Sequence, residues 1–344
     1  MGLAHAEREL GLDSRTLVLD EPPKGFEADQ LLFPRGTGRL TREWRRWRFA
    51  LRELRSFDVV HFNFGSTLMP TRHPDSHPAL RLYAALVEGG DLRWLPKRIA
   101  VFVTYQGDDA RQAHHRFAAL PPGYFDPRVD ATKRRAIERF TRRADGIFAV
   151  NPDLLEVLPP NARFLPYASV DLREWQPVAP RADRTPLVVH APSNRAVKGT
   201  EHVVRGVERL RGEGMHVDLF LVEGATRAEA RAAYARADIV VDQLLIGWYG
   251  GMAVEAMALA RPVIAHIAQD DLARVPSKLA RDLPIVRATA DSFEDVLRAT
   301  LTQPRGALAA LGRQGRVFVE QWHDPLTIAR KTRDAYLTAV RSRR

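Results

Sequence analysis

The chain has 344 residues, of which 45% are hydrophobic and 27% charged, so it can bury sizeable cores and is not a disordered chain. It contains no cysteine, which excludes disulfide bonds, thiolate catalysis and cysteine-ligated zinc. The formal net charge of +10 attracts anions such as phosphates, nucleic acid or acidic lipid headgroups, without choosing among them.

The first half of the chain alternates short apolar runs with helical patterns. The apolar runs predict strands, which cover residues 15–19, 59–62, 99–104 and 146–150. The segments between them repeat apolar residues at helical spacing, over residues 39–55, 78–89 and 130–143. Because short strands alternating with amphipathic helices are typical of parallel α/β layers, we expect this half to form a doubly wound domain.

The predicted helix at residues 39–55 is strongly basic, with seven arginines and two glutamates. Its arginines lie opposite an apolar stripe made of Leu40, Trp44, Trp47, Leu51 and Leu54. A basic amphipathic helix can lie on an anionic membrane. Its more common role is to cover a sheet while its outer face stays wet, and we favour this plainer role here.

A stretch with several prolines, between residues 166 and 186, separates the two halves. Prolines interrupt regular structure and are common between domains. We therefore predict an N-terminal domain at residues 1–170 and a linker at 171–184.

The second half repeats the alternation and predicts a C-terminal domain at residues 185–320. Its expected strands are 187–190, 217–222, 239–241, 262–266 and 284–286. Its expected helices are 200–213, 226–236, 251–260, 291–303 and 305–320. The remaining segment, 321–344, is helical in pattern from 325 to 340 and can cross back to the N-terminal domain.

The segment His190–Glu201 joins the end of a predicted strand to the start of a helix, which is where ligands bind in open α/β sheets. Arg195 and Lys198 there place two cations beside the backbone N–H groups of a helix N-terminus. A guanidinium, an ammonium and a helix dipole together can stabilise a diphosphate. The plainer interpretation is a solvated basic loop, and this segment alone leaves both open.

A second strand, glycine turn and helix follow in residues 239–263. Gly250 and Gly251 allow a ligand to approach the backbone. Glu255, one turn into the helix, can accept hydrogen bonds from two vicinal hydroxyls such as those of a ribose. Its carboxylate can also simply interact favourably with the positive end of the helix dipole. The helix is rich in alanine and methionine, as expected for burial, and a carboxylate in such a helix needs a partner.

These segments resemble, in order and spacing, the C-terminal domain of retaining glycosyltransferases of the family-4 type. The matching segments are Lys198–Glu201, Asp238–Val241, and Glu255–Ala258 with Pro262 and Val263. Parts of the first half are similar to the family's N-terminal domain, namely Phe57–Phe62, Tyr105–Arg111, Ala144–Ile147 and Asn151–Leu155.

The resemblance implies the glycosyltransferase-B fold, in which two Rossmann-like, doubly wound α/β domains face each other across a cleft. It further implies that the second domain binds a nucleotide-sugar donor and the first domain binds the acceptor. Carried over by position, Arg195 and Lys198 hold the donor diphosphate as the catalytic cations. The other implied donor-binding residues are Asn194, Tyr249, Gly250, Gly251 and Glu255, the last on the ribose. The implied acceptor-side or sugar contacts are Gln106, Asp108 and Asp109.

Three features depart from the family pattern. The position of the family's first paired glutamate, eight residues before Glu255, is Gly247, so one expected contact to the donor sugar is absent. Gln106 stands where the family often has histidine; it can bond a sugar hydroxyl but cannot titrate. The family also begins with a strand and a glycine-rich loop ahead of a helix like Gly2–Leu10, so either the start is truncated here or the N-terminal sheet lacks its usual first strand.

We therefore expect a retaining glycosyltransferase that moves a sugar from a nucleoside-diphosphate donor to a saccharide or small-molecule acceptor, with no metal and no cofactor. The sequence has no Asp-x-Asp pair to hold a divalent metal on a diphosphate, and no Walker loop. No apolar run reaches the roughly 18 residues of a membrane span, and the first residues do not resemble a signal peptide. A cytoplasmic protein is expected, with peripheral contact to an anionic membrane left open.

Two alternatives remain at this point. The chain can be a non-catalytic relative that binds a nucleotide sugar or a glycan, which Gly247 makes credible. It can also be a basic nucleic-acid-binding protein, which would need cations grouped with exposed aromatic residues. In the leading interpretation, Arg195 and Lys198 lie on an exposed loop rim, so replacing either by alanine lowers turnover without changing the melting temperature.

Overall fold

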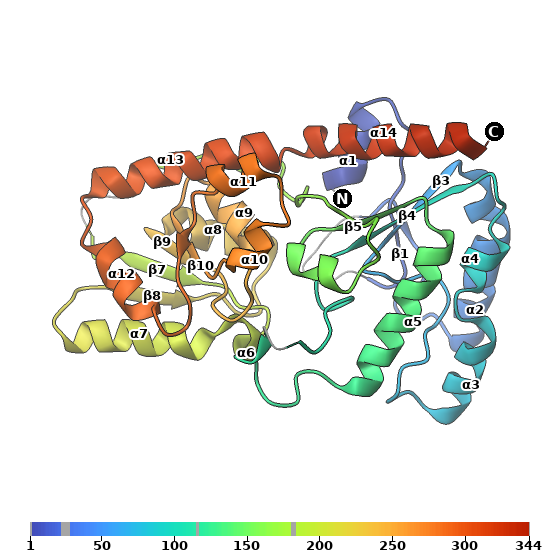
Figure 1. The fold of residues 1–344 in the computed structure, drawn as a ribbon, viewed down its shortest axis with the longest axis horizontal. Helices are drawn as coiled ribbons and strands as arrows, with labels where there is room; N and C mark the ends of the chain where they lie inside the picture. Colours follow the sequence, from blue (N-terminus) through green and yellow to red (C-terminus); the bar gives the residue numbers. More distant parts are fainter. Residues whose placement is uncertain (1, 22–27, 115–116, 180–183, 344) are drawn as a thin grey trace.

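The computed structural model describes residues 2–21, 28–114, 117–179 and 184–343. Two α/β lobes lie side by side, and the long helices α13 (Arg305–Trp322) and α14 (Pro325–Arg343) run along one edge of both (Figure 1). Each lobe is built on a parallel sheet with helices packed against it, so the predicted fold class is confirmed.

The N-terminal lobe contains a parallel sheet in the order β3-β4-β5-β6 and a separate parallel pair, β1-β2. Its strands are β1 (Leu17–Val18), β2 (Gln30–Leu31), β3 (Val59–Asn63), β4 (Ala100–Tyr105), β5 (Gly146–Ala149) and β6 (Arg163–Phe164). Its helices are α1 (Gly2–Glu9), α2 (Arg39–Arg48), α3 (Pro78–Val87), α4 (Gly90–Trp94) and α5 (Pro127–Arg143).

Strand β4 shows why the apolar runs were informative in this lobe. All six of its residues are buried, as expected for a central parallel strand covered on both faces. The strand predicted at 15–19 is shorter than expected and lies outside the main sheet. Only Leu17 and Val18 are extended there, and they pair with β2 rather than with β3.

The C-terminal lobe contains a parallel sheet in the order β11-β10-β9-β7-β8. Its strands are β7 (Leu187–His190), β8 (Asp218–Leu221), β9 (Ile239–Val241), β10 (Val263–Ala265) and β11 (Val286–Arg287). Besides α13, its helices are α6 (Arg195–Lys198), α7 (Thr200–Gly212), α8 (Arg227–Arg236), α9 (Gly251–Ala258), α10 (Gln269–Leu272), α11 (Ser277–Asp282) and α12 (Phe293–Leu301). The chain enters this sheet at β7, which lies between β8 and β9, and the strand order reverses between β7 and β9.

The final helix, α14, packs against the sheet of the N-terminal lobe. Ile328 and Tyr336 of α14 share a buried apolar cluster with Phe102 of β4 and Phe148 of β5. Tyr336 also bonds His61 of β3, with 2.5 Å between its hydroxyl and Nδ1. Of the predicted linker, residues 180–183 lie outside the described residues.

Helix α2 and the turns after it bring only part of the predicted apolar stripe into the core, namely Trp47 and Leu54. Leu40 is 88% exposed and Trp44 60%, whereas Phe49 and Ala50 are buried. A π-helical turn at Phe49–Glu53 follows α2 and changes the angular spacing of its side chains, so the stripe is not continuous. The expected core-facing orientation of the stripe is therefore wrong at Leu40, Trp44 and Leu51. None of the described helices is long and apolar enough to span a membrane.

Candidate functional site

The candidate site lies where β7 and β9 end side by side. Their last residues, His190 and Val241, are paired in the sheet, so the loops that follow leave from the same edge. In open parallel sheets this reversal of strand order creates a crevice outside the carboxyl ends of the strands. The segment His190–Glu201 contains the first of these loops, and the second loop, residues 242–250, contains the glycine turn that the sequence also singled out.

The first loop is held by Asn194 and turns into the short helix α6. The Asn194 side-chain oxygen accepts hydrogen bonds from the N–H groups of Ala196 (3.1 Å) and Val197 (3.3 Å). These are among the N–H groups expected to face a phosphate, and Asn194 already satisfies them. Helix α6 ends at Gly199, whose φ of 77° is a left-handed conformation that favours glycine. Asn194 therefore acts as a helix cap in this structure.

Lys198 points from this loop toward the loop after β9. Its Nζ lies 3.2 Å from Oδ1 of Asp242 and 2.6 Å from Oε1 of Gln243. The Asp242 side chain is fully buried, and only 17% of the Lys198 side chain is exposed. Lys198 is thus not on an exposed rim, as the sequence had suggested, because Asp242 draws the ammonium inward.

Arg195 points the other way, toward the end of β8. Its guanidinium lies 2.9 Å from a carboxylate oxygen of Glu201 and 3.1 Å from one of Glu223. The Arg195 side chain is 43% exposed, so the expected exposed position is correct for this residue. Asp242 follows β9 and Glu223 follows β8, and these two strands lie on opposite sides of β7. The ammonium of Lys198 and the guanidinium of Arg195 therefore point away from each other.

The glycine turn after β9 closes over the Lys198 ammonium. The Gly250 N–H donates to Oδ2 of Asp242, and a Cβ built on Gly250 would lie 3.2 Å from Lys198 Nζ. A Cβ on Gly251, by contrast, has nothing within 4 Å among the described atoms. Lys198, Asp242 and Gly250 therefore form one compact unit, and the backbone at Gly251 faces open space.

Tyr249 was predicted to contact the donor, but its side chain is buried. Its hydroxyl lies 3.0 Å from Nε2 of His323, whose Nδ1 is 2.9 Å from the carbonyl oxygen of Tyr167. Because a carbonyl only accepts, Nδ1 carries the proton and Nε2 accepts from Tyr249. The side chain has no exposed surface to offer a ligand, and it fixes the glycine turn to the junction of α13 and α14.

Glu255 has a partner within the protein. Its Oε1 lies 3.8 Å from Nε of Arg227 at the start of α8, and about a fifth of its side chain is exposed. Arg227 in turn donates to the Ser169 carbonyl oxygen at 3.0 Å, and its guanidinium lies over the Trp175 ring. The partner expected for a carboxylate in this buried helix is therefore supplied by Arg227, and ribose binding by Glu255 stays a prediction.

Gly247 has no room for a side chain. A Cβ built on it would lie 2.5 Å from the Cβ of Ala268 and 3.1 Å from a carboxylate oxygen of Asp271. Its carbonyl oxygen also accepts the Ala268 N–H at 2.8 Å, which holds the two segments together. The glycine at this position thus belongs to a close backbone contact between the loops after β9 and β10.

We expect Gly247→Glu to destabilise the protein and not to raise any transferase activity. The new side chain would meet Ala268 and the buried Asp271 carboxylate, and overpacking of this kind costs about 1–3 kcal/mol. Thermal unfolding measures the loss, with Gly306→Ala as the control because no atom of the described residues lies within 4 Å of a Cβ built at Gly306. An unchanged melting temperature for Gly247→Glu would contradict the close packing.

The acceptor-side residues gather at the end of β4 in the N-terminal lobe. The Asp109 carboxylate accepts the N–H groups of Gln106 (3.0 Å) and Gly107 (2.6 Å), and burial raises its pKa. Asp109 therefore shapes this turn from within. Asp108 is exposed and pairs at 2.7 Å with the buried Arg111, while Gln106 donates to Asn63 at 3.4 Å. Asp108 and Gln106 remain the groups that can reach an acceptor.

The two lobes meet beside these loops in an apolar cluster. Phe117 and Leu120 of the N-terminal lobe pack against Val197 of α6 and Leu245 and Ile246 of the glycine turn. Arg274 and Glu156 add an ion pair between the lobes at 2.7 Å. Arg111, the partner of Asp108, lies over the Phe117 ring, so the turn at the end of β4 and the α6 loop border the same junction.

Sequence reasoning missed Asp242, Gln243 and Glu223 as members of this site. All three follow short apolar strands or begin the loops after them, which is a signal available in the sequence. A polar residue directly after a buried parallel strand lies at the ligand-binding edge of the sheet. Their pairing with particular cations depends on the strand order, which spacing along the chain does not reveal.

Comparison with known proteins shows likeness in structure only. No family model matches the chain, and no curated protein does. Sucrose-phosphate synthase from Thermosynechococcus elongatus is similar over 99% of this chain and 92% of its own, with a TM-score of 0.63 and 16% identity. Anabaena HepE, solved with UDP-glucose, is similar over 90% of this chain and 86% of its own (TM-score 0.56, 13% identity).

A glycosyltransferase from Rickettsia africae is similar over 98% of this chain and 94% of its own, with a TM-score of 0.57 and 12% identity. The likeness spans both lobes in each case. The chain therefore has the glycosyltransferase-B fold, with two Rossmann-like domains, as predicted from its sequence.

Proposed function

We propose that the protein transfers a glycosyl group from a nucleoside-diphosphate sugar, with retention of configuration and without a divalent metal. The observation that carries the proposal is the unit of Lys198, Asp242 and Gly250 at the reversal point of the second sheet. It places an ammonium next to backbone that a ligand can approach at Gly251. The fold shared with nucleotide-sugar enzymes supports it.

In the proposed reaction, the bond between the anomeric carbon and the β-phosphate oxygen breaks, and its electron pair leaves with the diphosphate. The acceptor oxygen bonds to the same carbon, and its proton passes to the departing phosphate. Lys198 stabilises the negative charge that grows on the diphosphate in the transition state, where a preorganised cation contributes most. No protein general base is required.

Arg195 assists in this proposal by exchanging its present partners for the donor. Its ion pairs with Glu201 and Glu223 are solvent-exposed, and such pairs contribute only about 0–1 kcal/mol. Turning the guanidinium toward a diphosphate therefore costs little. Glu255 would bind the ribose while keeping Arg227 as its neighbour, and Gln106 and Asp108 would bind the acceptor, a saccharide or another hydroxyl-bearing small molecule.

The test is release of nucleoside diphosphate from UDP-, GDP- and ADP-sugars, with and without EDTA. We expect one nucleotide class to be turned over at a rate that EDTA does not change, and NMR of the product to show the donor's anomeric configuration. Loss of activity with EDTA would overturn metal independence, and an inverted product would overturn retention. Saturable binding of a nucleotide sugar without release of nucleoside diphosphate would favour a non-catalytic binder. The absence of a side chain at Gly247 supports this alternative.

A second prediction tests whether the diphosphate approaches the glycine turn. Gly251→Ala places a methyl group where no described protein atom lies within 4 Å, at the first position of α9. We expect unchanged or slightly raised stability, because alanine favours a helix, together with about tenfold weaker binding of the nucleoside diphosphate. Calorimetric titration measures the affinity, and Gly306→Ala is the matched control. Wild-type affinity in Gly251→Ala would remove this backbone from the donor site.

A further inference from the structure

Helices α2, α3 and α4 form an outer wall of the N-terminal lobe, at the end away from the C-terminal lobe (Figure 1). They are joined through Trp47 of α2. Its Nε1 donates to the Tyr83 hydroxyl of α3 at 3.0 Å, and its ring lies 5.1 Å from the ring of Trp94 of α4. The three helices are therefore side by side.

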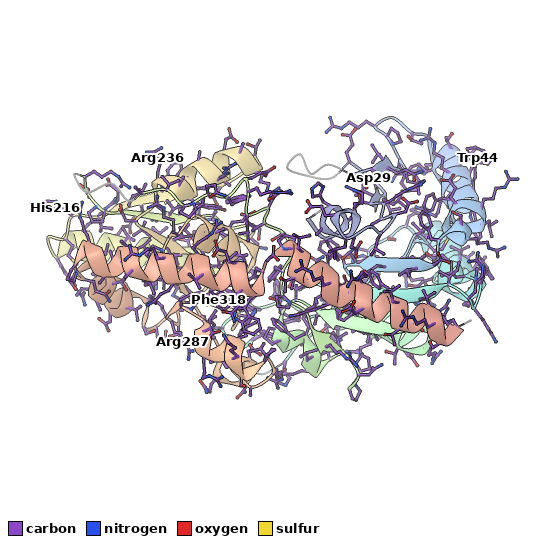
Figure 2. The ribbon with its side chains drawn as sticks, turned by 90° about the horizontal axis from the view of Figure 1, so that it is seen from above. Asp29, Trp44, His216, Arg236, Arg287 and Phe318 are labelled. Carbon is purple, nitrogen blue, oxygen red and sulfur yellow. The ribbon has the colours of Figure 1, made fainter. Side chains whose placement is uncertain are left out.

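This wall exposes large apolar side chains on both sides of the α2–α3 contact. Trp44 stands three residues before Trp47 on α2, and Leu86 stands three residues after Tyr83 on α3, so these two side chains flank the contact. Leu51, in the π-helical turn after α2, is exposed as well. Figure 2 labels Trp44 at the outer end of the lobe. The exposed residues of this apolar wall are Leu40 (88%), Trp44 (60%), Leu51 (43%), Leu82 (67%), Leu86 (69%) and Trp94 (40%).

Arginines surround the apolar wall. Four of the seven arginines in residues 39–55 are exposed, namely Arg39, Arg48, Arg52 and Arg55, whereas Arg46 is buried and Arg42 pairs with Asp20. Glu43 pairs with Arg46 and Glu53 with Arg48. The Arg48 and Arg93 guanidinium groups lie over the Trp44 and Trp94 rings. Arg52 and Arg81 are exposed beside Leu51 and Leu82. The wall thus combines protruding aliphatic and indole groups with an excess of positive charge.

We propose that the apolar wall docks on an anionic lipid bilayer. The positive charge of the wall favours a bilayer over a second copy of this chain. A second copy would bring two sets of arginines together, whereas acidic headgroups neutralise them. Of the six exposed side chains, only Trp44 and Trp94 offer bases a stacking surface, whereas the four leucines do not, and this favours a bilayer over nucleic acid. Leucine and tryptophan reach the acyl boundary, and arginines meet the phosphates, as in interfacial helices.

The experiment is co-sedimentation of the full chain with vesicles of phosphatidylcholine containing phosphatidylglycerol, and with vesicles of phosphatidylcholine alone. We expect binding to the acidic vesicles only, weakened by salt. The double variant Trp44→Ser, Leu86→Ser should bind about a hundredfold more weakly, since burial of each side chain contributes roughly a factor of ten. The matched control is Val317→Ser on α13, a residue 59% exposed on the other lobe.

Circular dichroism and thermal melting establish that the variants are folded, and Arg52→Glu, Arg81→Glu tests the charge without touching an apolar residue. Equal binding to both vesicle types, or wild-type binding by the double variant, would overturn the proposal. So would a dimer in solution that the double variant abolishes, or competition by single-stranded oligonucleotides for the same wall. The proposal is independent of transferase activity, because vesicle binding needs no donor.

Discussion

Lys198→Ala should lower donor turnover by about 10²–10³-fold, the usual effect of removing one preorganised group that stabilises developing negative charge. It should also destabilise the fold. The fully buried Asp242 carboxylate would lose its ammonium partner. It would still accept the Gly250 N–H, but the free-energy cost of burying its charge would no longer be offset by Lys198. Breaking a buried pair from one side costs about 3 kcal/mol or more.

A second substitution separates these two effects. In Lys198→Ala, Asp242→Asn the buried charge is gone, while the asparagine oxygen can still accept from Gly250, so we expect the melting temperature to recover and turnover to stay low. Arg195→Ala should lower turnover with little change in stability, because its ion pairs are exposed. Recovery of both stability and turnover in the double variant would make Lys198 a structural residue.

Acidification should destabilise the protein steeply between about pH 6.5 and pH 4. Burial lowers the pKa of His61 and of His323 to about 4, from an unfolded value near 6.5. A group with a depressed folded pKa binds fewer protons in the native state. The stability that each neutral histidine contributes is therefore complete above pH 6.5 and is lost as the pH falls toward 4. Each contributes about 3 kcal/mol over this range.

His61→Gln isolates one of these contributions. Glutamine can keep a bond to Tyr336 or Thr104 but has no proton to gain, so the slope of unfolding free energy against pH should become shallower. Burial raises the pKa of the neighbouring Glu7, so the native state gains stability from this group as the pH falls. This effect has the opposite sign to that of the histidines and reduces the total loss of unfolding free energy. Urea unfolding across this pH range measures the slope, and His216→Gln at an exposed loop position is the control. An unchanged slope in His61→Gln would contradict a buried neutral imidazole.

The sequence by itself determined the layered architecture, and it predicted which loops form the candidate site. The strands at 187–190 and 239–241 were predicted at their observed bounds, because a central parallel strand is a short apolar run limited by polar residues. Arg195, Lys198 and the glycines at 250 and 251 were found because they follow such runs. At one edge of a parallel sheet, position after a strand largely fixes position in space.

Only the tertiary structure decided where the side chains point. Lys198 turns inward because β9 lies beside β7 and presents Asp242, while Arg195 turns outward because β8 lies on the other side and presents Glu223. The apolar stripe of α2 faces outward at Trp44 because the helix continues into a π-helical turn whose own residues fill the core. These outcomes depend on which distant segments become neighbours, and local periodicity carries no information about such pairings.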